Sequence, residues 1–439
     1  MLTGAFARNS TGSNVSAFGS WDTNAIPTPV ATPFGPSIGN GLQVNAFSAK
    51  DGYAPYSEQW NVNLQRELPY NMFVMAAWAG NRVIHLPSQN NRIDQMNPSF
   101  DAQYGGVLST CAANKGNSVL SDTFSSGCAQ ADGFTAPYPN FVNDFGASST
   151  VAQSLEPYPQ FSYIMNNFEG FGTTYYQSIQ VEVDKRFSNG LSFLAGYTLS
   201  HLMDNTSSGF SSFTSGGINK YNQKPEWVVS NSDEPQTFKA SGTYELPIGP
   251  GKKYVNNHLL GNLVGGWQVG WILDYENGGD TGVGENGSPF PNGFERPNRN
   301  TSVPLGTASY KREKDQWLAG AHAAPAQIYN TAGFTATPSQ YVIGNSLRAY
   351  GKLREPGIAN EAINARKHFY IGEHVQAILQ VDYFNAFNRT IFNGPDTNFS
   401  DSLPGSSGTF GQTVSQGANV GAFNGTDNRQ GQVQLRLQF

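Results

Sequence analysis

Gln430-Gly-Gln-Val-Gln-Leu-Arg-Leu-Gln-Phe439 alternates polar and apolar residues without a break. Side chains of an extended strand point alternately to opposite faces. The apolar side chains therefore share one face: Val433, Leu435, Leu437 and Phe439. Such a strand suits either a transmembrane position between lipid and water or the half-buried sheet of a soluble sandwich. Recurrence of the pattern along the chain separates these two interpretations.

The composition is unusual for soluble domains. Of the 439 residues only 13% are charged, against roughly 25% in average proteins, and the chain has 49 Gly, 29 Phe and 20 Tyr. The mean hydropathy is −0.41, and no apolar run approaches the roughly 18 residues that a membrane-spanning helix needs. A transmembrane barrel passes this test because half of each strand is polar. The net charge of −6 and the scattered Lys and Arg residues argue against a nucleic-acid partner.

The alternation recurs in eight further segments, so the sequence predicts nine strands. The hairpin around Asn189-Gly190 gives the strongest local pattern. Segment 360–369 gives the weakest, because Glu361 and Lys367 share a face with apolar residues. The eight segments are about 56–68, 74–78, 179–183, 191–199, 238–246, 267–275, 360–369 and 377–383.

Long and short connections alternate strictly along the chain. The long ones are polar stretches at about 82–172, 201–235, 277–356 and before the last strand. Outer-membrane barrels have short periplasmic turns and long external loops. The sequence therefore predicts an all-β protein, an antiparallel transmembrane β-barrel of about nine strands, in a Gram-negative outer membrane. Residues 1–53 are expected to form a loop that leads into the barrel, and residues 54–439 the barrel itself.

Residues at the start of the sequence bear on export. Met1 is followed by Leu-Thr-Gly-Ala-Phe-Ala-Arg, which has neither a basic start, nor an apolar core, nor a cleavage site. No signal peptide is therefore expected in these residues. If the protein lies in the outer membrane, we expect its N-terminal part to lie outside this sequence.

Aromatic residues of the apolar face sort by strand end, as the girdles of a membrane barrel do. Phe187, Trp267 and Phe369, with Phe439, fall at the expected periplasmic ends, and Tyr197, Tyr275 and Tyr383 at the external ends. Trp267 and Tyr275 are separated by about 26 Å of strand, or nearer 20 Å after tilting, close to the apolar band of roughly 25 Å. The core aromatics of a soluble sandwich would not sort in this way.

Cys111 and Cys128 lie in one polar stretch. They are candidates for a local disulfide in an oxidising compartment, worth roughly 3 kcal/mol. Two free thiols in a cytosolic loop are the alternative. A zinc site is not expected without clustered histidines.

Several ordered segments resemble the C-terminal barrel region of the Oar-like TonB-dependent transporters. They span about residues 54–439 and include Tyr56-Ser-Glu-Gln-Trp-Asn-Val-Asn-Leu-Gln-Arg-Glu-Leu-Pro69, 185–201, 240–252, Gly265-Gly-Trp-Gln-Val269, Asn345-Ser-Leu-Arg348 and Phe384-Asn-Ala-Phe-Asn388. The resemblance implies a 22-stranded barrel around a plug, energised through a TonB box. This sequence matches only the final part of that plan, and Glu361 stands where the family has an apolar residue.

The resemblance implies the barrel portion of a transporter that binds a solute at its external loops and imports it by plug movement. The implied partners are outer-membrane lipid, an unidentified solute, and TonB through the missing N-terminal region. The apolar face of 430–439 would be recognised by the barrel-assembly machinery. A passive channel, a surface adhesion barrel and a secreted all-β carbohydrate-active enzyme are the alternatives.

No enzymatic or cofactor site is expected. The sequence has no His-Glu-x-x-His, Gly-x-Ser-x-Gly or phosphate-binding glycine loop. Asp396-Thr-Asn398-Phe-Ser400 faintly resembles a calcium loop but lacks its glycine and distal Glu.

Overall fold

The structure is a computed structural model. The described residues are 40–46, 53–89, 91–166, 169–206, 214–215, 217–249, 251–255, 258–286, 296–307, 327–338, 341–371, 375–389, 392–413 and 429–439. Most of the N-terminal segment 1–53 lies outside these ranges.

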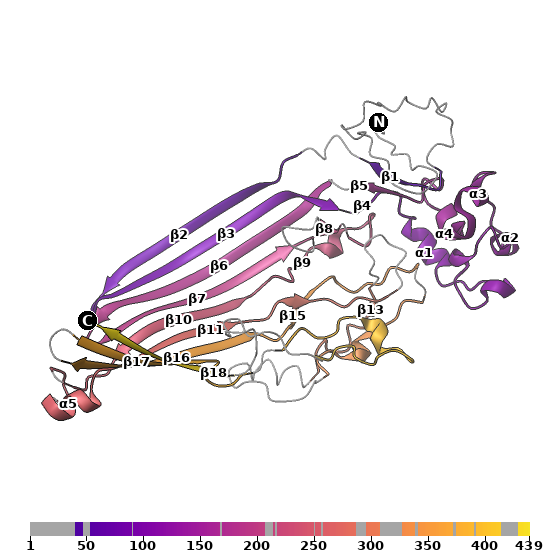
Figure 1. The fold of residues 1–439 in the computed structure, drawn as a ribbon. Coiled ribbons are helices and arrows are strands. Elements are labelled where there is room, and N and C mark those ends of the chain that lie inside the picture. The colour runs from indigo at the N-terminus through magenta and orange to yellow at the C-terminus, as the bar shows by residue number, and fades with distance from the viewer. Residues whose placement is uncertain are drawn as a thin grey trace, which may run out of the picture.

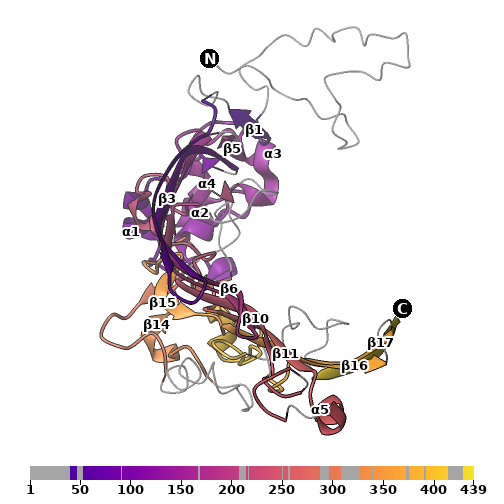
Figure 2. The same cartoon turned by 90° about the vertical axis from the view of Figure 1, so that its left-hand side faces the viewer.

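The main element is an antiparallel sheet whose strands follow the path β18-β17-β16-β11-β10-β7-β6-β3-β2 (Figure 1). The nine predicted strands and their antiparallel order are therefore confirmed. Figure 2 shows the sheet curved into an arc that does not close on itself. The bounds are β2 Tyr56–Leu68, β3 Met72–Gln89, β6 Glu169–Ser188, β7 Leu191–Asp204, β10 Gln236–Glu245, β11 Trp267–Glu276, β16 Ile358–Ile371, β17 Val375–Phe384 and β18 Gln430–Gln438.

Two tight turns at one end of the sheet explain why adjacent segments form hairpins. Asn189 and Gly190, between β6 and β7, have φ of 52° and 81°. Tyr70 and Asn71, between β2 and β3, have φ of 67° and 57°. Two consecutive left-handed residues match the right-handed twist of the flanking strands. These turns fix the register of both hairpins.

The register places the predicted apolar residues on one face of the sheet. One cross-strand row, for example, runs through Val181, Tyr197, Phe238 and Tyr275. On β6, Ile179 and Val181 are exposed, whereas Ser178 on the opposite face is buried and Gln180 is half-buried. Because curvature crowds side chains on the concave side, the apolar residues lie on the convex side and the polar ones in the hollow.

The long connections were predicted as polar loops, but in the structure they contain helices and short strands. Residues 91–166, expected as polar loop, contain the helices α1 Pro98–Tyr104, α2 Cys128–Ala131, α3 Phe141–Phe145 and α4 Val151–Ser154. The same region contains β4 Asn91–Arg92, β5 Tyr163–Asn166 and the 3-10 helices η1 Ala112–Asn114, η2 Val119–Ser121 and η3 Gly146–Ser148. Within the segment expected as a leading loop, β1 Gln43–Ala46 pairs in parallel with β5.

The remaining short elements also belong to the long connections. The strands β8 Thr214–Ser215 and β9 Val228–Val229 extend the main sheet beside β3 and β7. The pairs β12 Asp280–Thr281 with β15 Tyr350–Arg354, and β13 Asn298–Arg299 with β14 Phe334–Thr335, form separate small sheets. The 3-10 helices are η4 Lys224–Glu226, η5 Thr331–Gly333 and η6 Phe399–Ser402.

Two hydrophobic cores hold the long connections together. The first surrounds Leu120, Phe124 and Phe141 in 91–166 and includes Tyr341 from the β11–β16 connection. The second joins residues of the β11–β16 connection, such as Tyr329 and Phe334, to Phe399 and Phe410 of the β17–β18 connection. We call the described residues of the four long connections, those that follow β3, β7, β11 and β17, the loop cap. It lies at the end of the sheet opposite the tight turns (Figure 1).

Within the described part of the chain, no helix is long and apolar enough to cross a membrane. The helix α5 His258–Val264 lies in the connection between β10 and β11, where the sequence predicted only a short connection.

Candidate functional site: a polar hollow beneath the loop cap

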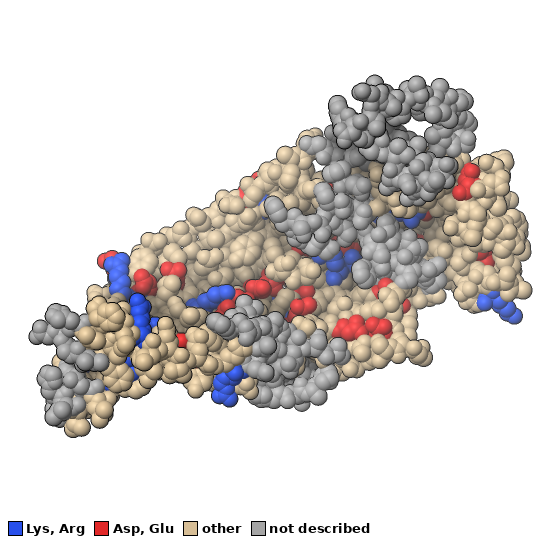
Figure 3. Space-filling model, in the orientation of Figure 1, with Lys and Arg blue, Asp and Glu red and all other residues tan. Residues whose placement is uncertain are grey.

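The concave face of the sheet forms a polar hollow, and Figure 3 shows acidic and basic side chains gathered on this face. Lys239 on β10 lies between two carboxylates of β11, with Nζ 2.6 Å from Glu276 Oε1 and 3.4 Å from Asp274 Oδ1. At the β18 edge of the sheet, Gln432 of β18 donates a hydrogen bond to Asp382 of β17 at 3.0 Å. The polar side chains of the alternating strands thus form a hydrogen-bonded lining of the hollow, and water can reach this lining.

A buried charge network ties the loop cap to the ends of the strands. Arg296 binds Glu226 through two hydrogen bonds, of 2.7 Å and 3.1 Å. Arg348 forms an ion pair with Asp204 at the end of β7 and also contacts Glu226. Bidentate pairs between buried arginine and carboxylate fix geometry as well as charge. The end of β7 and the β7–β10 and β11–β16 connections are therefore held in one arrangement.

A second set of contacts attaches the loop cap next to the ends of β10 and β11. Arg354 on β15 donates to Asp233 Oδ2 at 2.6 Å, to the Asp233 carbonyl at 2.7 Å and to the Gly278 carbonyl at 3.2 Å. Asp280 on β12 is nearby and buried, and burial raises the pKa of its carboxyl to about 7. This part of the loop cap therefore contains a carboxyl group that titrates near neutral pH.

Polar contacts also join the first core to the neighbouring connection. Gln95 donates to the Ile218 carbonyl at 2.8 Å and accepts from the backbone N–H of Lys220 at 2.7 Å. The Tyr221 hydroxyl donates to the Gln95 carbonyl at 3.0 Å. Arg92 forms ion pairs with Asp94 and Glu156, and burial raises the pKa of Glu156 to about 8.

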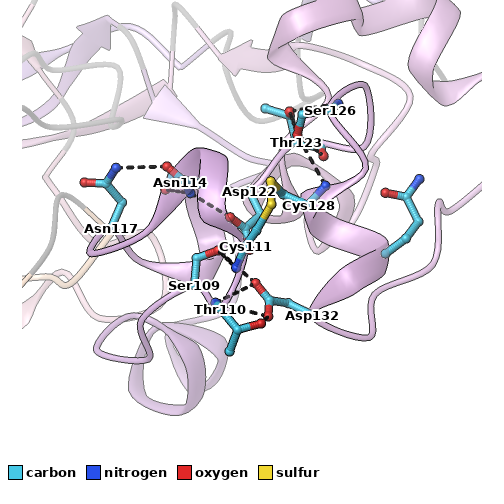
Figure 4. The surroundings of a disulfide bond; sticks show 12 residues. Ser109, Thr110, Cys111, Asn114, Asn117, Asp122, Thr123, Ser126, Cys128 and Asp132 are labelled. Atoms are coloured by element: carbon cyan, nitrogen blue, oxygen red, sulfur yellow. Dashed lines mark hydrogen bonds between the residues drawn. A yellow bond between two sulfur atoms is a disulfide. The ribbon is translucent and has the colours of Figure 1, made fainter.

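The structure joins Cys111 and Cys128 in a disulfide with a Cα–Cα distance of 5.3 Å (Figure 4). The bridge fastens the segment that contains η1 to the start of α2. Beside it, Asp132 accepts from Ser109 Oγ at 2.9 Å and from the Thr110 N–H at 3.2 Å. The Thr110 hydroxyl donates to the same carboxylate, and these hydrogen bonds lower the pKa of Asp132 to about 2. Figure 4 shows Ser109, Thr110 and Asp132 grouped next to the bridge.

The aromatic residues singled out in the sequence lie on the convex face. Phe187, Tyr197, Phe369 and Tyr383 are exposed, and Trp267 and Tyr275 are half-buried. Tyr197 and Tyr275 both pair with Phe238, whose ring centroid lies 6.1 Å from that of Tyr275.

The last strand, β18, is an edge of the main sheet, and among the described strands it pairs with β17 alone. Its apolar side chains stand exposed on the convex face, and the terminal phenylalanine is 96% exposed. The exposed set is Val433, Leu435, Leu437 and Phe439.

In the segment that faintly resembles a calcium loop, the polar side chains accept hydrogen bonds from other residues of the β17–β18 connection. Asp396 accepts from the Asn398 N–H at 2.9 Å and from the Thr409 hydroxyl at 2.6 Å. Asn398 accepts from the Ser400 N–H at 3.2 Å, which caps η6. Across the residues that the structure describes, no group of three or more His, Cys, Asp or Glu residues could hold a metal ion.

The buried charge network was not predicted from the sequence. Its members come from connections far apart in the chain and follow no periodicity. Asn345-Ser-Leu-Arg348 was quoted for its resemblance to a family, and the structure gives Arg348 of that motif a role in the network. Its carboxylates lie between 204 and 234 and its arginines between 296 and 354, and no spacing in the sequence links the two sets.

The solved structures that are similar to this chain include three outer-membrane proteins of low sequence identity. The outer membrane transporter YddB from Escherichia coli has a TM-score of 0.36 and 9% identity, covering 91% of this chain and 34% of YddB. The FrpB iron transporter from Neisseria meningitidis has a TM-score of 0.32 and 10% identity, with coverages of 90% and 33%. The pyoverdine receptor FpvA from Pseudomonas aeruginosa, bound to pyoverdine, has a TM-score of 0.33 and 9% identity, with coverages of 87% and 30%.

The chain thus spans about a third of the length of each of these structures. No curated protein matches it. The family model described as "Outer membrane beta barrel domain" matches residues 3–432, nearly the whole chain. The chain therefore belongs to the outer membrane beta barrel domain family, and it is an antiparallel β-barrel protein of the Gram-negative outer membrane.

Proposed function

We propose that this chain is the C-terminal barrel portion of an Oar-like TonB-dependent transporter. In the intact protein, the loop cap binds a solute and an energised plug inside the barrel admits it. Residues 54–439 supply the barrel, and residues 1–53 lead into it. The partners are outer-membrane lipid, the barrel-assembly machinery, an unidentified solute, and TonB through a region upstream of this chain. The chain itself has no enzymatic role in this proposal.

The observation that carries the proposal is the fixed attachment of the loop cap to the strand ends. The Arg348–Asp204 and Arg354–Asp233 ion pairs attach the external connections to the strand ends. Loops that only shielded a barrel would not need buried ion pairs, whose desolvation is costly. Loops that bind a solute benefit from pre-organisation, because less ordering is needed when the solute binds.

The two edges of the sheet support a barrel larger than nine strands. In an antiparallel path of nine strands, β2 and β18 run in the same direction. Pairing them directly would give a parallel contact, so antiparallel closure requires an odd number of further strands. Unpaired strand edges are not tolerated in lipid. We assign those strands to the same polypeptide, consistent with the larger barrel that the family resemblance implies.

The convex face supports the remaining assignments. We assign Phe187, Trp267 and Phe369 to the periplasmic aromatic girdle and Tyr197, Tyr275 and Tyr383 to the external girdle. The exposed apolar residues of β18 and Phe439 form the insertion signal read by the assembly machinery.

Conductance of the whole gene product in a planar lipid bilayer tests the proposal. A plugged transporter gives no steady current, and it opens channels only when urea on one side unfolds the plug. A barrel that conducts steadily without urea would favour the alternative, a passive channel. A barrel that stays closed both with and without urea would favour an adhesion protein and contradict transport. The Phe439-deleted protein, scored for folding by its heat-modifiable gel migration, is a control for non-specific leakage.

A further inference from the structure

The connection between β10 and β11 carries an exposed apolar surface that the barrel does not require. On α5, Leu260, Leu263 and Val264 follow the i, i+3, i+4 spacing that places them on one helix face. Leu263 is 70% exposed, and the other two are also exposed. Tyr254 and Val255, just before the helix, are exposed as well. We call these five residues the α5 patch.

The helix is held firmly although it is short. Gly265 follows α5, and a Cβ at this position would lie 2.4 Å from the Gly249 Cα and 2.5 Å from the Gly261 carbonyl oxygen. Glycine is therefore required for the helix end to pack on the turn that follows β10. The turn is closed by hydrogen bonds between Tyr254 N–H and the Pro247 carbonyl, at 2.9 Å, and between Gly249 N–H and the Tyr254 carbonyl, at 3.0 Å.

The α5 patch adjoins the lipid-facing side of the sheet. Lys367 of β16 is buried on the convex face, where its Nζ donates to the Gly265 carbonyl. The same ammonium group lies 5.7 Å from the ring centroid of Trp267 and 5.1 Å from that of Phe369. Figure 1 shows α5 beyond the strand ends opposite the loop cap, and Figure 2 shows it on the convex side of the arc.

We propose that the α5 patch contacts the phospholipids of the inner leaflet at the boundary between headgroups and acyl chains. Its apolar side chains continue the convex surface that already faces lipid, and an exposed apolar surface in water is unfavourable. A short helix with one apolar face lies in the plane of such an interface. Lys253, whose Nζ lies 5.3 Å from the Tyr254 ring centroid, is placed to reach the headgroup phosphates.

Site-directed spin labelling tests this proposal in the whole gene product, reconstituted in vesicles of phosphatidylethanolamine and phosphatidylglycerol. Cys111 and Cys128 are joined to each other, and any cysteine upstream of this chain is replaced by serine, so Leu263→Cys supplies a single site for the label. Only protein with the heat-modifiable migration of a folded barrel is measured. The matched control is Arg186→Cys, an exposed position near the turn end of β6 on the polar face. Collision rates are measured with oxygen, which partitions into lipid, and with nickel ethylenediaminediacetate, which stays in water.

The proposal predicts a higher ratio of oxygen to nickel collisions at position 263 than at position 186. An equal or lower ratio at 263 would place α5 in the aqueous periplasm and overturn the proposal, leaving a periplasmic protein as the occupant of the patch. A second pair of variants tests the cause. With the label moved to Leu260→Cys, Leu263→Asp should shift the ratio toward nickel, whereas Leu263→Ala should change it little. Equal effects of Asp and Ala would contradict lipid contact.

Discussion

Glu361 and Arg389 form a buried ion pair on the apolar face of the sheet, with 2.6 Å between Arg389 Nε and Glu361 Oε1. Glu361 belongs to β16 and is fully buried. Arg389 lies just after β17, and its guanidinium carbon is 5.7 Å from the ring centroid of Phe387. A carboxylate on this face, without a partner, would carry a large desolvation penalty. The pair explains how β16 holds an acidic residue at an apolar position.

Removing one partner of this pair should be strongly destabilising. Arg389→Ala leaves the Glu361 charge buried, and the expected loss is about 3–5 kcal/mol of unfolding free energy. The double variant Glu361→Leu with Arg389→Leu should recover most of that loss, because no charge remains to be desolvated. Urea unfolding of the barrel in vesicles measures both. Lys252→Ala, which breaks the exposed pair with Glu245, is the control and should cost less than about 1 kcal/mol. A similar small loss for Arg389→Ala would contradict this account.

The disulfide should stabilise the first part of the loop cap without affecting the barrel. Replacing both Cys111 and Cys128 by Ser should cost that part about 3 kcal/mol, because the bridge closes a loop of 17 residues. Chymotrypsin cleavage at the buried Phe124 and Phe141 requires opening of the core and should become roughly 100-fold faster. Heat-modifiable migration of the barrel should not change. Unchanged cleavage would mean that the hydrophobic core suffices without the bridge.

The stability of the loop cap should fall as pH rises toward neutral. Burial raises the pKa of Asp280 to about 7 from the ordinary 3.8. The folded state therefore binds the proton more tightly, so this stabilisation is complete below about pH 4 and is lost as pH rises through 7. Arg354 and Arg348 favour the charged form of Asp280, and Asp233 opposes it.

Hydrogen-exchange protection of β12 and β15, corrected for intrinsic exchange rates, should decrease between pH 5 and pH 8. The variant Asp280→Asn should flatten this dependence. Asp132→Asn should leave it unchanged, because hydrogen bonds lower the pKa of Asp132 to about 2, outside the measured range. If Asp280→Asn kept the full pH dependence, another group would be responsible.

Assembly should depend on the last residue. Deleting Phe439, which is 96% exposed on the apolar face, should reduce the amount of folded protein in the outer membrane. Gln438→Ala changes the neighbouring residue on the opposite face and serves as the control, with levels close to those of the unchanged protein. Quantitative blotting of outer-membrane fractions gives the comparison. Equal levels for the two variants would remove Phe439 from the insertion signal.

The strands could be predicted from the sequence because their determinants are local. Alternation along β6 and β7, with Asn189-Gly190 between them, specifies both the hairpin and its faces. The strand β16 was the weakest prediction, because Glu361 finds its partner 28 residues away and Lys367 binds the Gly265 carbonyl, 102 residues away. No local pattern indicates such long-range partners.

The loop cap could not be predicted for a related reason. Its helices are four to seven residues long, too short to be stable by propensity alone. They form because Phe124, Phe141 and Tyr341 share one core and because the Cys111–Cys128 bridge closes the chain. The residue types at Cys111 and Cys128 suggested the pairing, whereas nothing suggested that Glu226 would bind Arg296 and contact Arg348.

The central claim is that the apolar face of the nine-stranded sheet contacts lipid and the polar face lines a water-filled hollow. Cysteine scanning of Ile179, Gln180, Val181 and Glu182, four consecutive residues in the middle of β6, tests this claim most directly. In vesicles that carry the whole gene product, with urea added to unfold the plug as in the conductance measurement, a polar, water-soluble maleimide should label positions 180 and 182 and spare 179 and 181. Uniform labelling, or labelling of 179 and 181 alone, would contradict the account.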